Sequence, residues 1–289
     1  MAMQPSLHEA LYYEPRDGKA VHCRLCPKNC VIADGSAGFC RSRANRGGKL
    51  YSLIYGKTTG ISLDPIEKKP LYHFHPGEQI LSLGTRGCNL ACIFCQNWRI
   101  SQNPQALTQD ITSQQVIDEA LRQKSFGIAY TYNEPFIWYE FVYDCCCLAR
   151  EQGLENVLVT NGYVNQEPLK QLLPFIGAMN IDLKAMDDDF YREVCKGTLQ
   201  PVLETIIRAK QSCHIELTNL VIPNKNDTDA HFQRLTDWIF ENTGADTALH
   251  FSRYFPCFQM DQPATPVKTL ERAAAIARKK LKRVYLGNV

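Results

Sequence analysis

The feature that most constrains this chain is a loop with three cysteines that directly follows a short apolar run. Residues 81–97 read LSLGTRGCNLACIFCQN and place Cys88, Cys92 and Cys95 in CxxxCxxC spacing. We expect Leu81–Gly84 to be a buried strand and the rest a loop that brings the thiols together. Iron–sulfur clusters are normally held by four cysteines, so three thiolates on a four-iron cluster leave one iron for another ligand. A three-cysteine zinc loop and unrelated buried thiols are the alternatives.

A second group of cysteines lies near the N-terminus, in a segment with few apolar residues. Cys23, Cys26, Cys30 and Cys40 stand there among Gly, Asp, Asn and basic residues. Such a segment cannot build a core of its own, and four thiolates around one metal would substitute for that core. Zinc and a second Fe–S cluster both accept four thiolates. We favour zinc because the segment is polar, and four free thiols are the remaining alternative.

After residue 80 the chain alternates between short β-branched or aromatic runs and helical patterns. The predicted strands are 81–84, 127–132, 156–160, 179–184, 214–222, 248–254 and 284–286. The predicted helices are 113–126, 135–152, 166–175, 188–211, 228–242 and 266–281. Such alternation indicates right-handed βαβ units and a parallel sheet. Six units are fewer than the eight of a closed barrel, so we predict an α/β fold, an open, partial (β/α)6 barrel of TIM type.

Two domains are expected from this pattern. The first, residues 1–75, is a small Cys-rich metal-binding segment with a connector, and the second, residues 76–289, is the partial barrel. In the first domain the sequence predicts a short helix, Pro5–Tyr12. His73 and His75 are two residues apart and would share one face of a strand. We expect them near the barrel mouth, with metal ligation by the pair as the alternative.

Polar side chains gather where the predicted strands end. Active sites of parallel α/β barrels form at the carboxyl ends of the strands. The residues at these ends are Tyr132, Asn133, Glu134, Thr160, Asn161, Gly162, Asp182, Lys184, Thr218, Asn219, Asn224, His250, Arg253 and Tyr254. They carry hydrogen-bonding groups where an apolar strand has ended, and together they predict a ligand site.

Charge and cysteine content exclude several classes of protein. The 32 basic and 30 acidic side chains are spread along the chain, so no nucleic-acid partner is expected. No apolar run approaches the length of a membrane span and no export signal is present, which predicts a soluble, cytoplasmic protein without a membrane partner. Thirteen cysteines in a long chain of this kind favour metal ligation in a reducing compartment over disulfides.

The three-cysteine loop resembles the CxxxCxΦC loop of radical S-adenosylmethionine (SAM) enzymes, with Phe94 as the aromatic residue. In that family the amino and carboxylate groups of SAM chelate the open iron of a [4Fe–4S] cluster. TNG at residues 160–162 and DLK at residues 182–184 match segments of the pyruvate formate-lyase activating type. Glu134 and Pro135 match the end of its GGE-P segment.

This chain also departs from the activating type at two places. Tyr132 and Asn133 stand where those relatives carry two glycines, and Val159 stands where glycyl-radical activators place an aspartate. A closer resemblance, over nearly the whole chain, is to the AmmeMemoRadiSam-type radical SAM proteins. The matching pieces are CRLCPKNC, GFC, DPIEKKPLYHFHPG, GCNLACIFCQNW, YTYNEP, TNGY, IDLKA and HFSRYFP.

The resemblance implies a [4Fe–4S] cluster on Cys88, Cys92 and Cys95, and SAM as the second cofactor. The residues implied to contact SAM are Phe94, Asn97, Tyr132, Asn133, Glu134, Thr160, Asn161, Asp182, Lys184 and Asn219. The substrate is expected to meet aromatic walls and either Arg253 or His250. The walls would be Trp98, Tyr130, Tyr132, Tyr254 and Phe255.

The function implied is that of a radical SAM enzyme. A reduced cluster would cleave SAM to a 5′-deoxyadenosyl radical that abstracts hydrogen from an unidentified substrate. A flavodoxin- or ferredoxin-like electron donor and a small-molecule or protein substrate are the expected partners. Activation of a glycyl-radical enzyme is one alternative. A non-catalytic iron–sulfur or zinc protein for electron transfer or scaffolding is the other.

Overall fold

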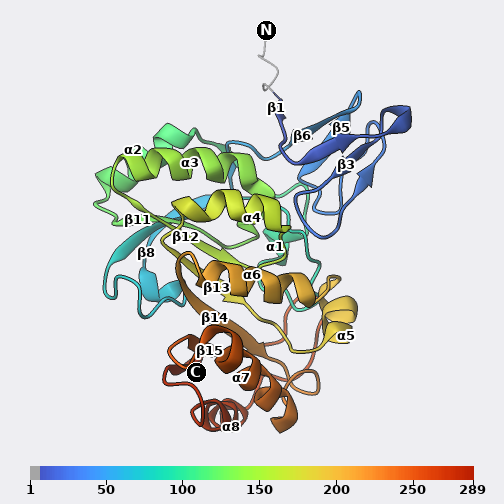
Figure 1. Ribbon diagram of the computed structural model, residues 1–289. Coiled ribbons are helices and arrows are strands. Elements are labelled where there is room, and N and C mark those ends of the chain that lie inside the picture. Colours follow the sequence, from blue (N-terminus) through green and yellow to red (C-terminus); the bar gives the residue numbers. More distant parts are fainter. Residues whose placement is uncertain (1–6) are drawn as a thin grey trace.

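The computed structural model describes residues 7–289, and its main element is an open eight-stranded sheet (Figure 1). The spatial order is β16-β15-β14-β13-β12-β11-β9-β8. The strands are β8 (Gly60–Pro65), β9 (Gln79–Gly84), β11 (Gly127–Tyr130), β12 (Glu155–Thr160), β13 (Ala178–Asp182), β14 (His214–Val221), β15 (Ala248–Arg253) and β16 (Val284–Gly287). All seven strands from β9 to β16 pair in parallel, and this confirms the predicted α/β partial barrel.

One edge of the sheet differs from the prediction. β8 pairs antiparallel with β9 from Gly60 to Pro65, so part of the segment assigned to the first domain belongs to the main sheet. The chain then passes through the short η2 (Ile66–Lys68) before it enters β9. The sequence shows no βαβ pattern here because an antiparallel neighbour needs no crossover helix.

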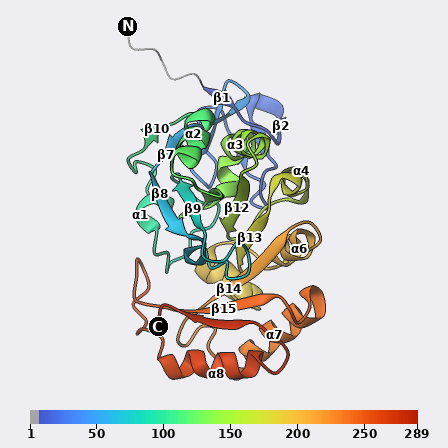
Figure 2. The ribbon, with the colours of Figure 1, turned by 90° about the vertical axis from the view of Figure 1, so that its left-hand side faces the viewer.

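Helices that follow the strands cover the outer face of the sheet (Figure 2). They are α2 (Ser113–Arg122), η3 (Pro135–Trp138), α3 (Tyr139–Glu151), α4 (Gln166–Leu172), η4 (Leu173–Phe175), α6 (Gln200–Lys210), α7 (Asp229–Thr243) and α8 (Val267–Ala277). α2 begins with a capping box, in which the Thr112 hydroxyl accepts from Gln115 N and the Gln115 side chain accepts from Thr112 N. It ends before residue 126 because Lys124 adopts a left-handed φ of 54°.

The predicted helix over residues 188–211 is wrong as a single element. The chain forms α5 (Asp188–Phe190) and then the π-helix η5 (Tyr191–Cys195). A turn separates η5 from α6. Lys196 ends the π-helix at a φ of 60°. The break has a tertiary cause, because the carbonyls of Val194 and Cys195 leave the helix pattern to bind the three-cysteine loop.

The N-terminal segment forms two small antiparallel sheets instead of the predicted helix. The first contains β1 (His8–Glu9), β5 (Arg43–Arg46) and β6 (Lys49–Ser52), and the second contains β2 (Tyr13–Pro15), β3 (Val21–Cys23) and β4 (Val31–Ile32). The predicted helix over residues 5–12 is therefore wrong where the structure describes it, from residue 7 onward. Pairing with β6 and a hydrogen bond from Ala10 N to Leu50 O at 2.8 Å outweigh the local helical pattern.

Short elements complete the described chain. They are η1 (Asp17–Lys19), β7 (Lys57–Thr58), α1 (Trp98–Ser101) and β10 (Gln109–Asp110). β7 and β10 pair with each other in a two-stranded sheet.

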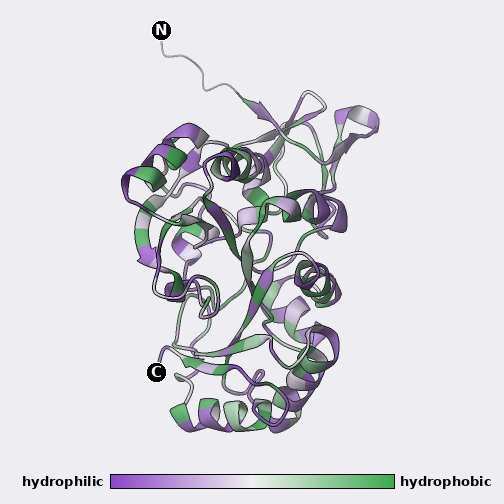
Figure 3. Ribbon diagram, turned by 60° about the vertical axis from the view of Figure 1, so that its left-hand side comes forward, coloured by the Kyte–Doolittle hydropathy of each residue, from purple (hydrophilic) through white to green (hydrophobic). Residues whose placement is uncertain are grey.

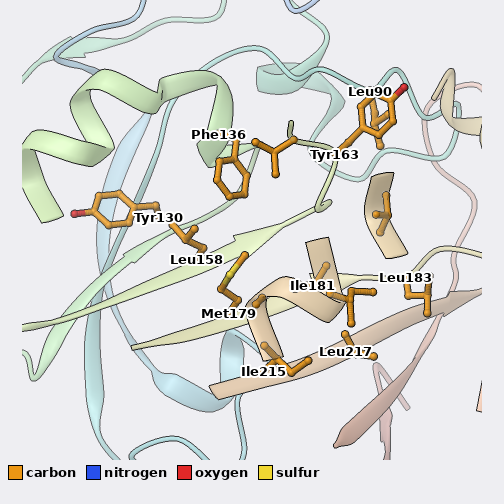
Figure 4. Close-up of a cluster of buried hydrophobic side chains, with 14 of the residues drawn as sticks. Leu90, Tyr130, Phe136, Leu158, Tyr163, Met179, Ile181, Leu183, Ile215 and Leu217 are labelled. Atoms are coloured by element: carbon orange, nitrogen blue, oxygen red, sulfur yellow. The ribbon is translucent and has the colours of Figure 1, made fainter. Parts of the chain in front are cut away.

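The larger hydrophobic core lies between the sheet and its helices. The helices carry hydrophobic and hydrophilic residues along their turns (Figure 3), and their buried apolar residues, such as Val116 of α2 and Leu270 of α8, belong to this core. Figure 4 shows part of this core, including Leu158, Met179 and Ile215 from three neighbouring strands. A separate apolar cluster contains Ile66, Leu71, Ile80, Ala129, Val157 and Ala178.

His73 and His75 lie at the amino-terminal end of the strands, so their predicted place at the barrel mouth is wrong. Residues 73–75 form no strand, and His75 has a φ of 47°. The His75 ring stacks on Phe126, which precedes β11, with ring centroids 4.7 Å apart. His73 Nε2 lies 2.7 Å from the Tyr285 hydroxyl. The segment closes the end of the sheet opposite to the candidate site.

Candidate active site

The three-cysteine loop leaves the carboxyl end of β9 and is fixed from both sides. The π-helix binds it through Ala91 N to Cys195 O at 2.9 Å and Ile93 N to Val194 O at 3.1 Å. On the other side, the Asn133 amide accepts from Thr85 N at 3.0 Å and donates to Gly87 O at 2.9 Å. These hydrogen bonds fix the backbone of the loop relative to the sheet and to the π-helix.

Cys88, Cys92 and Cys95 all line one cavity of about 360 Å³ at this end of the sheet. Nine of the ten residues expected to contact SAM line the same cavity: Phe94, Asn97, Tyr132, Asn133, Glu134, Thr160, Asn161, Asp182 and Lys184. They come from the ends of β9, β11, β12 and β13. The structure therefore brings three thiols and a set of polar strand ends around one space large enough for a ligand.

Asn219 is the tenth residue and does not line the cavity. Its Nδ2 donates to Leu183 O at 2.8 Å and to Lys184 O at 3.2 Å. Thr218, the residue before it on β14, lines the cavity. Successive residues of a strand point to opposite faces, and this alternation directs Asn219 away. Asn219 instead positions the backbone of residues 183–184.

Glu134 is buried at the cavity wall and joins two strand ends. Its Oε1 accepts from Phe136 N at 3.0 Å and from the Thr160 hydroxyl at 2.7 Å, and its Oε2 accepts from Asn161 N at 2.8 Å. Burial raises the pKa of Glu134 to about 7, against the opposing effect of these hydrogen bonds. The carboxyl group therefore fixes the residues that follow β12.

Asn161 is placed directly against the cysteine loop. Its Nδ2 lies 3.5 Å from Cys88 Sγ and donates to Asn89 Oδ1 at 2.9 Å. Its Oδ1 accepts from Tyr163 N at 2.8 Å. Through these contacts the end of β12 fixes the position of the first thiol.

Lys184 supplies a buried cationic group next to the three-cysteine loop. Its Nζ donates to Asp182 Oδ2 at 2.8 Å and lies 5.7 Å from the centroid of the Phe94 ring. Burial by itself would lower the pKa of Lys184, but Asp182 and the thiols of Cys92 and Cys195 raise it well above the usual range. The ammonium is thus held ready for an anionic group in the cavity.

Tyr132 adopts a left-handed backbone, with a φ of 71°. Relatives of the activating type carry glycine in this segment, and glycine reaches such a φ without steric cost. Here side-chain contacts hold the tyrosine instead. Its hydroxyl donates to Asp64 Oδ2 at 3.0 Å, and its carbonyl accepts from Asn97 Nδ2 at 2.6 Å.

Lys68 and Lys69 also line the cavity, although sequence reasoning gave them no site role. Lys69 is buried and its Nζ binds Asp64 Oδ2 at 2.9 Å. Burial opposes the charged form of Asp64, but hydrogen bonds from both lysines outweigh it and lower the pKa to about 2. The signal that could have found these residues is DPIEKKPLYHFHPG, a piece that no generic barrel requires.

Of the residues expected to contact substrate, Tyr132 lines the cavity and six do not: Trp98, Tyr130, His250, Arg253, Tyr254 and Phe255. Tyr130 is fully buried, with its hydroxyl donating to Asn156 Oδ1 at 3.3 Å. The Tyr254 hydroxyl donates to Met260 O at 2.8 Å. Arg253 Nε donates to Thr265 O at 2.8 Å, and its guanidinium lies over the Phe255 ring. Strand alternation explains the position of Arg253, because the residue before it, Ser252, lines the cavity.

His250 and Trp98 have partners of their own. His250 Nε2 lies 2.6 Å from Glu216 Oε2, deeper inside the sheet. The Trp98 ring stacks on Phe258, with centroids 5.2 Å apart. Leu220 on β14 and Ser252 on β15 line the cavity instead. Sequence reasoning selected neither residue.

The N-terminal cysteines Cys23, Cys26, Cys30 and Cys40 line a second, separate cavity. Within residues 7–289, no three His, Cys, Asp or Glu side chains are already arranged around one metal-ion position. No helix in the described part of the chain combines the length and apolar character needed to cross a bilayer.

Comparison with known proteins places these features in a family. The model of the radical SAM superfamily matches residues 82–239, which include the cysteine loop and the strand ends around the cavity. An uncharacterised protein of Methanocaldococcus jannaschii is 46% identical over 98% of this chain and 86% of its own length. The pyruvate formate-lyase-activating enzyme of Clostridium pasteurianum is 22% identical over 53% of this chain and 66% of its own length.

Solved structures show the same fold. A radical SAM methyltransferase from Sphaerobacter thermophilus superposes with a TM-score of 0.57 at 17% identity, over 74% of this chain and 67% of that one. SuiB of Streptococcus suis, bound to S-adenosylmethionine, gives a TM-score of 0.57 at 13% identity, over 73% of this chain and 52% of that one. The chain therefore belongs to the radical SAM superfamily, whose members use a [4Fe–4S] cluster and S-adenosylmethionine.

Proposed function

We propose that this chain is a radical SAM enzyme in which Cys88, Cys92 and Cys95 hold the [4Fe–4S] cluster and the adjoining cavity holds SAM. The observation that supports this most is that the three thiols open into one cavity of about 360 Å³, whose other walls are polar strand ends. A cluster held by these thiols would supply one-electron reducing chemistry toward SAM, and the pair would serve to abstract hydrogen from a substrate.

The residues of this chain then bind and orient SAM. Lys184, held by Asp182, offers a charge-assisted hydrogen bond to the carboxylate of SAM. Phe94 offers an aromatic face to a flat ring. Glu134 acts one step further away, because its carboxyl group fixes Thr160 and Asn161 at the cavity wall. The substrate is proposed to enter next to Thr218, Leu220 and Ser252, which line the part of the cavity formed by β14 and β15.

The proposal includes a one-electron donor of the flavodoxin or ferredoxin class and a substrate that is a small molecule or a protein. Activation of a glycyl-radical enzyme is the second candidate. It is supported by the similarity to activating enzymes over about half of this chain. It is weakened by Tyr132, Asn133 and Val159, which replace the residues of the activating type.

The test is whether the reduced protein turns over SAM. Anaerobically purified protein is reduced with dithionite, mixed with SAM, and assayed for 5′-deoxyadenosine and methionine by mass spectrometry. We expect 5′-deoxyadenosine above the level of the unreduced control. An intact cluster with neither product would overturn the enzyme proposal and favour a non-catalytic metal-binding protein. If 5′-deoxyadenosine forms, deuterium transfer into it from labelled fractions of a cell extract would identify the substrate class.

A further inference from the structure

The four N-terminal cysteines converge on one cavity from two tight turns. Cys23 ends β3, and Cys23 N donates to Cys30 O at 2.9 Å, which closes the turn that carries Cys26. Cys40 comes from a second turn, in which Arg41 N donates to Gly38 O at 2.9 Å. Both turns use left-handed residues, Asn29 at a φ of 44° and Arg41 at 62°. Their geometry therefore directs all four thiols to the same space.

The four thiols lie in a more apolar setting than the sequence suggested. The sequence favours zinc because the segment is polar, yet Cys23 and Cys26 are buried, and Leu25, Ile32 and Ile137 line the cavity with them. Four thiolates in such a setting can hold a four-iron cluster, in which each thiolate binds a different iron.

The surroundings of the cavity suit a buried cluster. Phe39 N donates to Cys30 Sγ at 3.5 Å, and Arg43 Nη1 donates to Cys23 Sγ at 3.6 Å. Leu25, Ile32 and Ile137 form apolar walls. Hydrogen bonds to sulfur and exclusion of solvent are the means by which proteins stabilise and tune iron–sulfur clusters. We propose that Cys23, Cys26, Cys30 and Cys40 hold a second [4Fe–4S] cluster, in place of the zinc ion that the sequence favoured.

The second cavity lies next to the SAM cluster loop. A Cβ built on Gly87 would lie 2.7 Å from Cys40 O and 2.2 Å from Ser42 Oγ. The Ser42 hydroxyl also donates to Arg86 O at 3.3 Å. The segment that carries Cys40 is therefore packed against the residue before Cys88. Four protein thiolates complete the second cluster, so it has no open iron for SAM, and it is chemically distinct from its neighbour.

The test counts iron in two sets of variants of the full chain. The protein is reconstituted anaerobically with iron and sulfide, desalted, and assayed for iron, sulfide and zinc. We expect about eight irons and eight sulfides per chain for the unchanged protein, from two clusters of four. Cys26→Ser with Cys30→Ser should reduce both numbers to about four. Cys213→Ser, a substitution of a cysteine outside both sets, should leave them at about eight.

A second variant keeps the proposal testable if the N-terminal substitutions unfold the chain. Replacing Cys88, Cys92 and Cys95 together by alanine should leave about four irons and an electron paramagnetic resonance signal of a reduced [4Fe–4S] cluster that does not change when SAM is added. About four irons per chain in the unchanged protein, or none in this triple variant, would overturn the proposal of a second cluster. One zinc per chain that persists after reconstitution would also overturn it. These outcomes are independent of SAM cleavage.

Discussion

Glu134 and Asn161 join two neighbouring strand ends, with Asn161 N donating to Glu134 Oε2 at 2.8 Å. The same Asn161 side chain lies 3.5 Å from Cys88 Sγ. One buried carboxyl group therefore fixes a residue that touches both the proposed SAM cavity and a proposed cluster ligand.

Replacing Glu134 by glutamine should weaken SAM binding and preserve the cluster. Glutamine has an NH₂ group in place of one carboxylate oxygen, and this group cannot accept a hydrogen bond. At least one of the donors at Asn161 N, Phe136 N and the Thr160 hydroxyl therefore loses its partner. A lost hydrogen bond to a charged group is worth roughly 1.5–3 kcal/mol, which is about tenfold or more in affinity. Isothermal titration of the cluster-loaded protein with SAM measures the change. Glu119→Gln, at a partly exposed position of α2, is the matched control, and equal affinities in the two variants would contradict this role.

Replacing Lys184 by alanine should also weaken SAM binding by about tenfold or more, because the charge-assisted bond offered to the SAM carboxylate is removed. The absorbance of the cluster should be unchanged. Lys170→Ala, at an exposed position of α4, serves as the control. Unaltered SAM affinity in Lys184→Ala would show that this lysine does not meet SAM.

Replacing Gly87 by alanine should impair assembly of the SAM cluster. Gly87 has a φ of 93°, and its new Cβ would clash with Ser42 Oγ and Cys40 O. Strain and overpacking of this kind cost roughly 1–3 kcal/mol each, and the chain can relieve them only by moving the cysteine loop. Gly153→Ala is the matched control, since Gly153 has a φ of 70° and a Cβ added there would meet no atom within 4 Å. We expect iron content to fall in Gly87→Ala alone, and equal iron content in both variants would refute the clash as a cause.

Glu216 should make the stability of the fold depend on pH in acid. Burial opposes its charge, but hydrogen bonds from His214, His250 and the backbone of Tyr72 and His73 outweigh burial and lower the pKa to about 2. A carboxyl group whose folded pKa is depressed contributes stability above its unfolded pKa of about 4.3 and loses it as the pH falls toward 2. The shift corresponds to roughly 3 kcal/mol.

Urea unfolding of the unchanged protein and of Glu216→Gln at pH 6 and pH 3.5 measures this contribution. The free energy of unfolding should fall more steeply between these pH values in the unchanged protein than in the variant. Parallel losses in the two proteins would exclude Glu216 as the source of the acid sensitivity.

The parallel sheet and the cysteine loop could be predicted because their signals are local. Alternating apolar runs and helical periods specify βαβ units, and three cysteines after a strand specify where the loop begins.

Features set by distant contacts could not be predicted. The π-helix that ends at Cys195 exists because its carbonyls bind residues 91 and 93 of another segment. The orientation of Tyr130 and Asn219 depends on the register of each strand, and a shift of one residue moves a side chain to the opposite face. Lys69 could not be placed because β8 enters the sheet by an antiparallel pairing that leaves no βαβ pattern.

The most direct test of the central proposal is 5′-deoxyadenosine formation in single cysteine variants. We predict that Cys88→Ala, Cys92→Ala and Cys95→Ala each form none above background, because each residue supplies one of three protein ligands to the SAM cluster. Cys213→Ala should form as much as the unchanged protein. Undiminished 5′-deoxyadenosine in any one of the three loop variants would contradict the assignment of the radical SAM cluster to this loop.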